Sequence, residues 1–332
     1  MNAIVAKGKG GSDVLQLEEV ALPWPAGRGD VLVRLRAAAL NPADMYFREL
    51  GGYVERAGPL ILGHDGAGTV EAVGADVVGI APGERVCFCY GGIGITHGTY
   101  AEYAVVPADV LAPIPTGIDF VTAAALPLVY ITLAESLHDR ANVQVGELVL
   151  IHAGAGGTGH MGVQLAKFRG ARVATTVSSA RKAALAQDLG AELTVAYRDR
   201  DFVAATRDWT QGQGLDVALD NVGADILRRT FKAMAPYGRV VTLAGTPGDT
   251  EEGSAYNANL TIHNVMMLTP MWWGLPERLR AQALHVREGL RLLAEGRLRV
   301  IIDRVFPWHE TRAAHDYLAG GEALGKVVLT ID

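Results

Sequence analysis

The stretch LVLIHAGAGGTG, residues 148–159, decides the fold of this chain. Its first four residues are apolar and predict a buried strand, and Gly154, Gly156 and Gly159 follow in the spacing G-x-G-x-x-G where a helix opens. The first glycine permits a tight turn, the second lets the backbone approach a pyrophosphate, and the third allows close helix–strand packing, while N–H groups at the helix start attract phosphate. We expect the dinucleotide to be bound by the whole turn: Gly154, Ala155, Gly156, Gly157, Thr158 and Gly159. The alternative is an ordinary strand-to-helix turn.

Strands and helices alternate on both sides of this turn from about residue 123 to residue 270. Apolar runs at 171–177, 216–220 and 238–244 each stand beside a segment of helical periodicity. Repeated strand–helix–strand units imply right-handed crossovers and a parallel sheet. The sequence therefore predicts an α/β protein whose residues 123–270 form a doubly wound, Rossmann-type dinucleotide-binding domain.

The two ends of the chain read differently from its middle. Residues 1–122 consist of short strand patterns broken by glycine and proline, which is typical of a mainly β domain. After residue 270 a long helix, 277–295, precedes strands expected at 300–302 and 326–331. Because these strands lie outside the strand–helix rhythm, we expect them to return to the first domain. That domain would be discontinuous, with residues 1–122 and 271–332.

Composition restricts the partners of the chain. Its 332 residues carry a formal charge of −6 and contain 49% hydrophobic and 20% charged residues, typical of a folded globular protein. Without a concentrated basic face, a nucleic-acid partner is not expected. The first residues lack a secretory signal pattern, and no apolar run is long enough for a membrane span. We therefore expect a cytoplasmic protein that does not contact a membrane.

The end of the second strand bears on the choice of cofactor. An acidic residue usually stands there when the adenosine ribose has a free 2′-hydroxyl. Here Ser178, Ser179, Arg181 and Lys182 follow the strand, and no acid is present. Hydroxyls and cations suit a 2′-phosphate, so the segment favours NADP(H). The alternative is that Arg181 and Lys182 belong to a solvated first helical turn.

Several motifs in order resemble the medium-chain dehydrogenase/reductase superfamily, specifically its zinc-free, zeta-crystallin-like quinone oxidoreductase branch. The matching stretches are NPADMY (41–46), GHDGAGTVEAVG (63–74), PGERV (82–86), the glycine turn, VAYR (195–198), DNVG (220–223) and GKVVL (325–329). The resemblance spans essentially the whole chain. It implies a GroES-like catalytic domain built from both chain ends, a central Rossmann domain, and catalysis between them. It also implies a homodimer formed through edge strands, for which 260–268 is the candidate.

Zinc-dependent relatives have a cysteine where this chain has Asn41, a histidine in Gly-His-Glu, and a later cysteine. Here the acid after His64 is aspartate, and no cysteine follows Cys89. A catalytic zinc generally takes three protein ligands, so we expect no metal. The remaining alternative is a metal site outside the family pattern, formed by Cys87, Cys89, His64 and His97; a cysteine pair two residues apart on a strand is more often packing.

Catalytic roles are implied by the resemblance for Asn41, which could donate a hydrogen bond to a substrate oxygen, and for Tyr46, which could orient the substrate or relay a proton. Tyr53 is a further candidate. Structural alternatives are a turn role for Asn41, core packing for Tyr46, and a backbone bond for a buried helical Thr132. The cofactor-binding residues implied in addition to the turn are Thr132, Ser178, Ser179, Arg181, Lys182, Tyr197, Asn221, Gly245 and Lys326.

Without zinc, hydride transfer from a reduced nicotinamide to an electron-poor acceptor is the expected chemistry, because the cofactor performs the difficult step. The expected function is an NADPH-dependent reductase of a quinone or an activated α,β-unsaturated carbonyl. The alternatives are a metal-free or unusually metallated alcohol or aldehyde dehydrogenase, and a nucleotide-binding, crystallin-like protein without catalysis.

Overall fold

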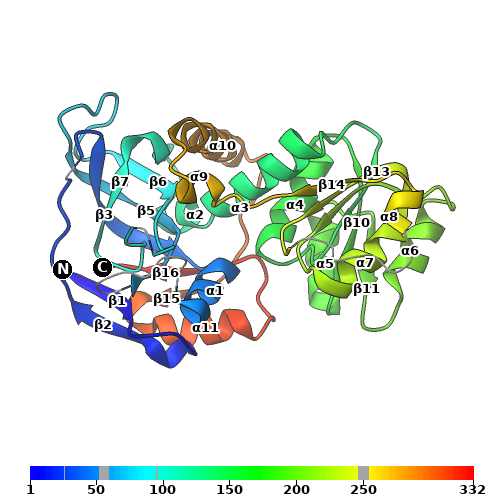
Figure 1. Cartoon of the computed structure of the whole chain (residues 1–332), viewed down its shortest axis with the longest axis horizontal. Coiled ribbons are helices and arrows are strands. Elements are labelled where there is room, and N and C mark those ends of the chain that lie inside the picture. The colour runs from blue at the N-terminus through cyan, green and yellow to red at the C-terminus, as the bar shows by residue number, and fades with distance from the viewer. Residues whose placement is uncertain (26, 52–59, 95, 246–253) are drawn as a thin grey trace. The chain divides into compact units, whose positions relative to one another are not determined.

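The computed structural model describes two compact units. The described residues are 1–25, 27–51, 60–94, 96–245 and 254–332. Unit 1 comprises Met1–Tyr130 and Leu268–Asp332, and unit 2 comprises Ile131–Met267. Figure 1 shows the elements of each unit. Among the helices in the described ranges, none combines the length and apolarity that crossing a bilayer requires.

Unit 2 contains a six-stranded sheet. Its strands are β9 (Leu148–Ile151), β10 (Arg172–Val177), β11 (Leu193–Ala196), β12 (Leu215–Asp220), β13 (Met234–Thr242) and β14 (Thr261–Asn264). All neighbours pair in parallel, in the order β11-β10-β9-β12-β13-β14. Numbered by chain order within the unit, this is 3-2-1-4-5-6, the doubly wound order. The order reverses between β9 and β12, so a ligand site is expected at their carboxyl ends.

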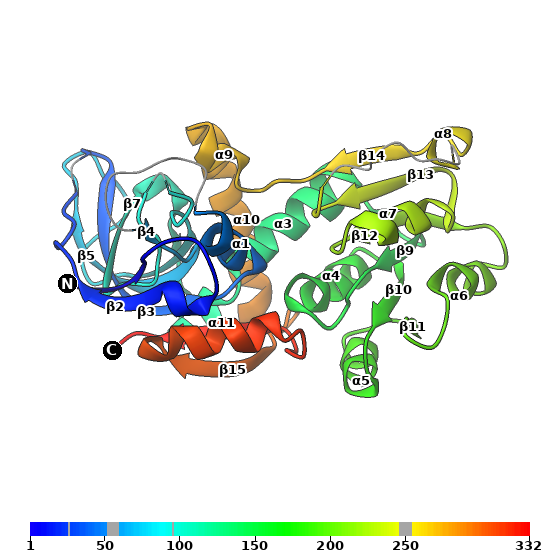
Figure 2. The same ribbon diagram turned by 60° about the horizontal axis from the view of Figure 1, so that its bottom comes forward.

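Helices cover both faces of this sheet (Figure 2). They are α4 (Gly157–Phe168), α5 (Ala180–Asp188), α6 (Phe202–Trp209), α7 (Ala224–Phe231) and α8 (Ser254–Asn257); before β9 the chain runs through α3 (Pro127–Leu133) and a π-helical segment, Ala134–Arg140. Leu150 of β9 packs in one core cluster with Phe202 of α6 and Phe231 of α7. Its neighbour Ile151 lies against Gly162 of α4, because successive strand residues face opposite sides. The sequence therefore needs apolar residues at every position of β9.

The glycine turn joins β9 to α4 through a close backbone approach. A Cβ on Gly159 would lie 2.0 Å from the carbonyl oxygen of Ala153, and one on Gly154 would lie 2.0 Å from Thr175 Oγ1. Gly156, in contrast, has an extended backbone (φ −82°), and its nearest obstacle is that same Ala153 oxygen at 3.3 Å. Two of the three glycines are thus required for packing, whereas Gly156 leaves space on its outer side.

Unit 1 is mainly β. Its larger sheet contains β3 (Asp30–Ala39), β5 (Asp65–Val73), β6 (Arg85–Cys89), β7 (Tyr103–Pro107), β8 (Ala112–Pro113), β15 (Ile302–Pro307) and β16 (Lys326–Thr330). β3 pairs antiparallel with β5, β7 and β16, so the C-terminal strands complete a sheet begun by the first third of the chain. A smaller sheet contains β1 (Asn2–Ala6), β2 (Leu15–Glu19) and β4 (Leu60–Ile61). The helices are α1 (Pro42–Leu50), α2 (Phe120–Ala124), α9 (Thr269–Trp272), α10 (Pro276–Ala294) and α11 (Thr311–Ala319).

The fold class expected from the sequence is confirmed, and two expected strands were wrong in their bounds. The strand expected at 300–302 begins only at Ile302 and continues to Pro307, because its pairing with β16 runs past the apolar run that marked it. The edge strand expected at 260–268 is limited to Thr261–Asn264, since only these residues pair with β13. β14 nevertheless ends the sheet, as expected (Figure 2).

The contrast between Gly159 and Gly156 makes a testable prediction. Gly159→Ala places a methyl against main chain that cannot move aside, so we expect about 1–3 kcal/mol of destabilisation. Gly156→Ala should leave thermal unfolding nearly unchanged and weaken dinucleotide binding, because its Cβ would occupy the space next to the helix start. Thermal unfolding and fluorescence titration with NADPH measure both. Equal unfolding temperatures for the two variants would contradict this account.

Candidate active site

The carboxyl ends of β9 and β12 meet at the point where the strand order reverses. Asn221 follows β12, and its Nδ2 donates to the carbonyl oxygen of His152, which follows β9 (2.8 Å). The Asn221 Oδ1 is buried and has no hydrogen-bond partner among the described residues. A buried acceptor without a partner is unfavourable unless a ligand or water completes it. Asn221 therefore offers an acceptor to a ligand donor beside the glycine turn.

The start of α4 offers donors in the same region. Gly156 is its N-cap residue, and no side chain caps the helix there. The first N–H groups of a helix have no partner within the helix, and the helix dipole favours an anion at this end. Together with the open side of Gly156, this fits the pyrophosphate of a dinucleotide. The residues present thus fit the cofactor that the sequence implied.

The end of β10 carries the residues expected to read the adenosine ribose. Ser178 and Ser179 are half-buried, and Ser179 Oγ caps α5 by accepting from the N–H of Lys182 (3.3 Å). Arg181 is exposed and Lys182 half-buried, both in the first turn of that helix. Tyr197, just after β11, donates its N–H to Val177 O, which places it next to the end of β10. The structure thus brings these residues to one edge of the sheet.

Two further residues expected to bind the cofactor, Thr132 and Gly245, lie elsewhere in the sequence. Thr132 is buried in α3, with 6% of its surface exposed. Gly245 has a φ of +106° and open space where a Cβ would stand, and its carbonyl oxygen accepts from Thr242 Oγ1 at the end of β13. Gly245 therefore also lies at the carboxyl edge of the sheet in unit 2.

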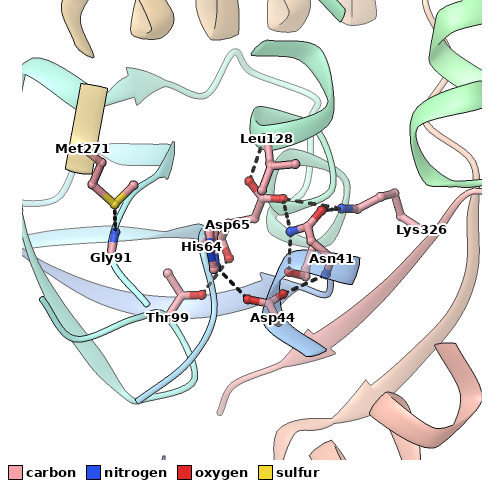
Figure 3. A network of polar contacts seen from close by, with 10 residues as sticks. Asn41, Asp44, His64, Asp65, Gly91, Thr99, Leu128, Met271 and Lys326 are labelled. Carbon is pink, nitrogen blue, oxygen red and sulfur yellow. Dashed lines mark hydrogen bonds and ion pairs between the residues drawn. The ribbon is translucent and has the colours of Figure 1, made fainter. Parts of the chain in front are cut away.

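A separate polar network lies inside unit 1 and centres on Asp65 (Figure 3). The Asp65 side chain is fully buried, and its Oδ1 accepts from the backbone N–H of Leu128 at the start of α3 (2.8 Å). Its Oδ2 accepts from Asn41 Nδ2 (2.9 Å) and lies 3.5 Å from Lys326 Nζ. Burial raises the pKa of Asp65, while Lys326 and Asn41 oppose that rise. All three neighbours donate, so the arrangement fits the ionised carboxylate.

Asn41 is held on both sides of its amide. Nδ2 donates to Asp65 and to Ala39 O (3.3 Å), and Oδ1 accepts from Lys326 Nζ at 2.5 Å. Asn41 is 1% exposed, and both of its amide protons have acceptors. We expected Asn41 to donate to a substrate oxygen and Lys326 to bind the cofactor; in the structure they bind each other and Asp65.

Asp44 links Asn41 to His64. One carboxylate oxygen accepts from the N–H of Asn41 (2.8 Å), which closes the capping box at the start of α1, and the other lies 2.7 Å from His64 Nδ1. Burial opposes ionisation of Asp44, but His64 and the Asn41 N–H outweigh it and lower the pKa of this carboxyl. The Nε2 of His64 is buried without a partner in the described residues. Asp44 thus fixes the orientation of the His64 ring.

Tyr46 and Tyr53 are the two tyrosines expected at the active site. Tyr46 lies on α1, is 49% exposed, and contacts Phe47 edge to face (centroids 5.8 Å apart). It therefore does not pack into the core, which was the structural alternative. Tyr53 lies outside the described residues.

In the part of the chain that the structure describes, Cys87, Cys89, His64 and His97 do not make up a metal-binding group, which was the remaining alternative. Cys87 and Cys89 are buried free thiols, and burial raises the pKa of both, which keeps them protonated. His64 contacts Asp44, as described above. Across the described ranges, no group of three or more His, Cys, Asp or Glu side chains is arranged to hold a metal ion.

Asp44, His64 and Asp65 belong to the network, although no role was expected for the two aspartates and His64 was considered only as a metal ligand. The signals were present: Asn41 and Asp44 have the spacing of a capping box, and His64-Asp65 is a polar pair within an apolar, glycine-rich strand. Buried polar residues need partners, so such a pair in a strand indicates a network.

A mainly β unit combined with a dinucleotide-type sheet defines a two-domain oxidoreductase. Residues 27–116 match the alcohol dehydrogenase GroES-like domain, and residues 189–329 match the zinc-binding dehydrogenase family. A 2-haloacrylate reductase of a Burkholderia species is 33% identical, with 99% of this chain and 98% of that protein covered. A quinone oxidoreductase of Pseudomonas aeruginosa is 33% identical, with 96% of each covered. The crystal structure of Escherichia coli quinone oxidoreductase complexed with NADPH superposes with a TM-score of 0.88 at 28% identity, covering 100% of each chain.

The chain therefore belongs to the medium-chain dehydrogenase/reductase superfamily, in its quinone oxidoreductase branch.

Burial of the neutral His152 ring makes the free energy of unfolding dependent on pH in the acid range. The ring lies between Thr176 Oγ1 (3.1 Å) and Thr230 Oγ1 (2.9 Å), and burial lowers its pKa to about 3. The unfolded chain binds this proton near pH 6.5, so the stability from neutral His152 is present above that pH and is lost as pH falls toward 3. We expect the loss between pH 7 and pH 4.5 to be about 2–3 kcal/mol.

Urea unfolding of wild type and His152→Gln at both pH values measures this loss. The variant should be less stable at pH 7 and should lose less stability on acidification. His138→Gln, which removes an exposed histidine from the same unit, is the matched control and should retain the wild-type pH dependence. If His152→Gln and wild type lose the same amount, His152 does not bind a proton on unfolding.

Proposed function

We propose that this protein is an NADPH-dependent reductase that transfers hydride to a quinone or an activated α,β-unsaturated carbonyl without zinc. The observation that carries the proposal is the acid-free end of β10, where two serines and two cations lie at the sheet edge that bears the glycine turn. NADPH supplies a hydride when bound, so the chain needs to bind, orient and shield rather than to perform the redox step itself.

Different residues of unit 2 would bind different parts of this cofactor. The glycine turn and the start of α4 would hold the pyrophosphate, and Asn221 Oδ1 would accept from a donor of the cofactor. Ser178, Ser179, Arg181, Lys182 and Tyr197 would contact the adenosine 2′-phosphate, and Thr132 and Gly245 would lie along the rest of the cofactor. The quinone oxidoreductase relative bound to NADPH supports this assignment.

The donor set of unit 1 does not fit a catalytic zinc. Such a site generally needs three protein ligands plus water, with neutral or anionic donors. Asn41 stands where zinc-dependent relatives have a cysteine, and its amide oxygen already accepts from the Lys326 ammonium (2.5 Å). A second cation beside this ammonium would be repelled in a buried setting. We therefore include independence from zinc in the proposal.

The acceptor class follows from the same reasoning together with the relatives. Without a metal to polarise an alcohol or aldehyde, the acceptor must be electron-poor by itself, as quinones and conjugated carbonyls are. Relatives named quinone oxidoreductase and 2-haloacrylate reductase support this class. Tyr46 and Tyr53 remain the residues proposed to contact the substrate. Asn41 is proposed to lie on the substrate side without donating to the substrate, since both of its amide protons already have acceptors.

An acceptor panel tests the function. Metal-analysed protein is mixed with NADPH or NADH and benzoquinones, naphthoquinones, enones, aldehydes or alcohols, and cofactor oxidation or reduction is followed. We expect NADPH oxidation with quinones or enones that is insensitive to chelators. Zinc near one per chain with chelator-sensitive alcohol oxidation would favour an alcohol dehydrogenase, and tight NADPH binding without turnover of any acceptor would favour a binding protein.

Lys182→Glu tests the cofactor preference. The reversed charge would lie next to the 2′-phosphate, so we expect NADPH affinity to fall at least about tenfold more than NADH affinity. Titration of the two cofactors by fluorescence measures both losses. Lys167→Glu, on the last turn of α4, is the control for charge reversal elsewhere and should weaken both little. Equal losses in Lys182→Glu would mean that Lys182 is only a surface cation.

We also propose that the protein works in the cytoplasm as a homodimer joined through β14. This strand ends the sheet of unit 2, and an unpaired sheet edge favours pairing with a second copy. Sedimentation of wild type against a variant with proline in β14 would test the dimer.

A further inference from the structure

We propose that the ammonium group of Lys326 contacts the carbonyl oxygen of the substrate and stabilises the negative charge that this oxygen gains on hydride transfer. The inference rests on the proposed function and deepens it by naming a catalytic residue. In this account Asn41 and Asp65 are positioning residues, which hold the ammonium in place.

The contacts of Asn41 exclude it as the donor to substrate. A primary amide has two N–H protons, and those of Asn41 point to Asp65 Oδ2 and to Ala39 O. Its carbonyl oxygen, in turn, accepts from Lys326. To donate to a substrate, Asn41 would have to leave a buried carboxylate without one of its partners, which is costly.

In contrast, one of the three ammonium protons of Lys326 has no acceptor among the described residues. An ammonium carries three protons, and within the described part of the chain its Nζ has two acceptors, Asn41 Oδ1 at 2.5 Å and Asp65 Oδ2 at 3.5 Å. The third proton meets no acceptor there. The residue is 2% exposed, so water does not solvate this group freely.

The Lys326 ammonium meets the opposite charge of Asp65 only at the longer of its two contacts. Its short contact is with a neutral amide, and the longer one is with a carboxylate that also accepts from Asn41 and from the N–H of Leu128. The other buried carboxylate of the network, Asp44, is directed at His64 and at the start of α1. A buried cation of this kind stabilises an anion more strongly than a solvated cation does, because no water competes and the site is already organised.

The reaction needs such a group. With an enone, the two electrons and one proton that NADPH would supply as hydride form a C–H bond at the electron-poor β carbon, and the π electrons of the C=C bond move toward the carbonyl, whose oxygen becomes an enolate oxygen. With a quinone, the hydride forms an O–H bond at one carbonyl oxygen, and the π electrons move through the ring to the other oxygen, which becomes the phenolate of a hydroquinone monoanion. The cofactor is oxidised and the acceptor reduced, and the oxyanion pairs with the Lys326 ammonium. Solvent then protonates the enolate at its α carbon, or the hydroquinone monoanion at its phenolate oxygen.

The test compares two acceptors that differ in the basicity of the oxyanion they form. 1,4-Benzoquinone forms a weakly basic oxyanion, and 3-penten-2-one forms a strongly basic enolate. We expect Lys326→Met to lower kcat with the enone about 100-fold or more, to lower it much less with benzoquinone, and to leave the NADPH dissociation constant unchanged. Lys326→Arg keeps the positive charge and should recover part of the enone activity.

Controls separate catalysis from folding. Lys326→Met leaves Asp65 buried without a cation, so Lys326→Met combined with Asp65→Asn removes both charges and should fold while keeping the selective loss with the enone. Arg48→Gln removes another buried cation of unit 1, one that binds Gly10 O and His315. It should lower thermal stability and leave the ratio of the two acceptor rates as in wild type.

Three outcomes would overturn the proposal. Equal fold losses of kcat with both acceptors in Lys326→Met would mean that Lys326 acts on structure alone. Weaker NADPH binding with equal losses would assign Lys326 to the cofactor, as its place in the GKVVL motif first implied. If wild type reduces neither acceptor, the proposed function fails and this proposal with it, whereas wild-type activity with equal losses in the variant overturns only the Lys326 proposal.

Discussion

The buried carboxylate of Asp65 constrains unit 1 more than any other single group. It accepts from the start of α3, from the residue before α1 and from the first residue of β16, which lie up to 261 positions from Asp65 in the chain. A buried charge is tolerated only when its partners are in place, and removing one partner typically costs 3–5 kcal/mol. The Asp65 carboxylate therefore requires that both ends of the chain meet in one sheet. It also sets the positions of Asn41 and Lys326.

In unit 2, backbone N–H groups rather than charged side chains form the proposed phosphate site. A dinucleotide phosphate needs several N–H donors close together, and a helix start without a side-chain cap provides them. The backbone can approach this closely only because Gly154 and Gly159 have no Cβ. Asn221 then joins the ends of β9 and β12 through His152 O, so that its own oxygen faces the same edge. Binding in this unit depends on main-chain geometry, whereas the polar centre of unit 1 depends on side-chain charge.

In the proposed reaction, the charge of the unit 1 network would favour electron-poor acceptors over a metal-dependent substrate. An ammonium and a metal ion repel each other, so the buried Lys326 ammonium would disfavour a metal at this place in addition to the missing ligands. An acceptor that is already electron-poor needs less polarisation than an aldehyde does. One fixed positive charge would be enough to stabilise the oxyanion that it forms.

The sequence by itself determined the fold class, the glycine turn, the parallel character of the unit 2 sheet and the acid-free end of β10, because these depend on local periodicity and on neighbours within a few residues. The same local reasoning left the ends of β14 and β15 wrong, since pairing with a distant strand sets where those strands stop. The family resemblance implied a substrate contact for Asn41 from its residue type and motif, whereas the partners of its amide come from distant parts of the chain and are not visible in the sequence. Only the tertiary structure shows that Lys326, 285 positions away, donates a hydrogen bond to the amide oxygen of Asn41. The physical reason is that a buried charge is paired with whichever polar groups the fold brings within hydrogen-bond distance, however far apart they are in the sequence.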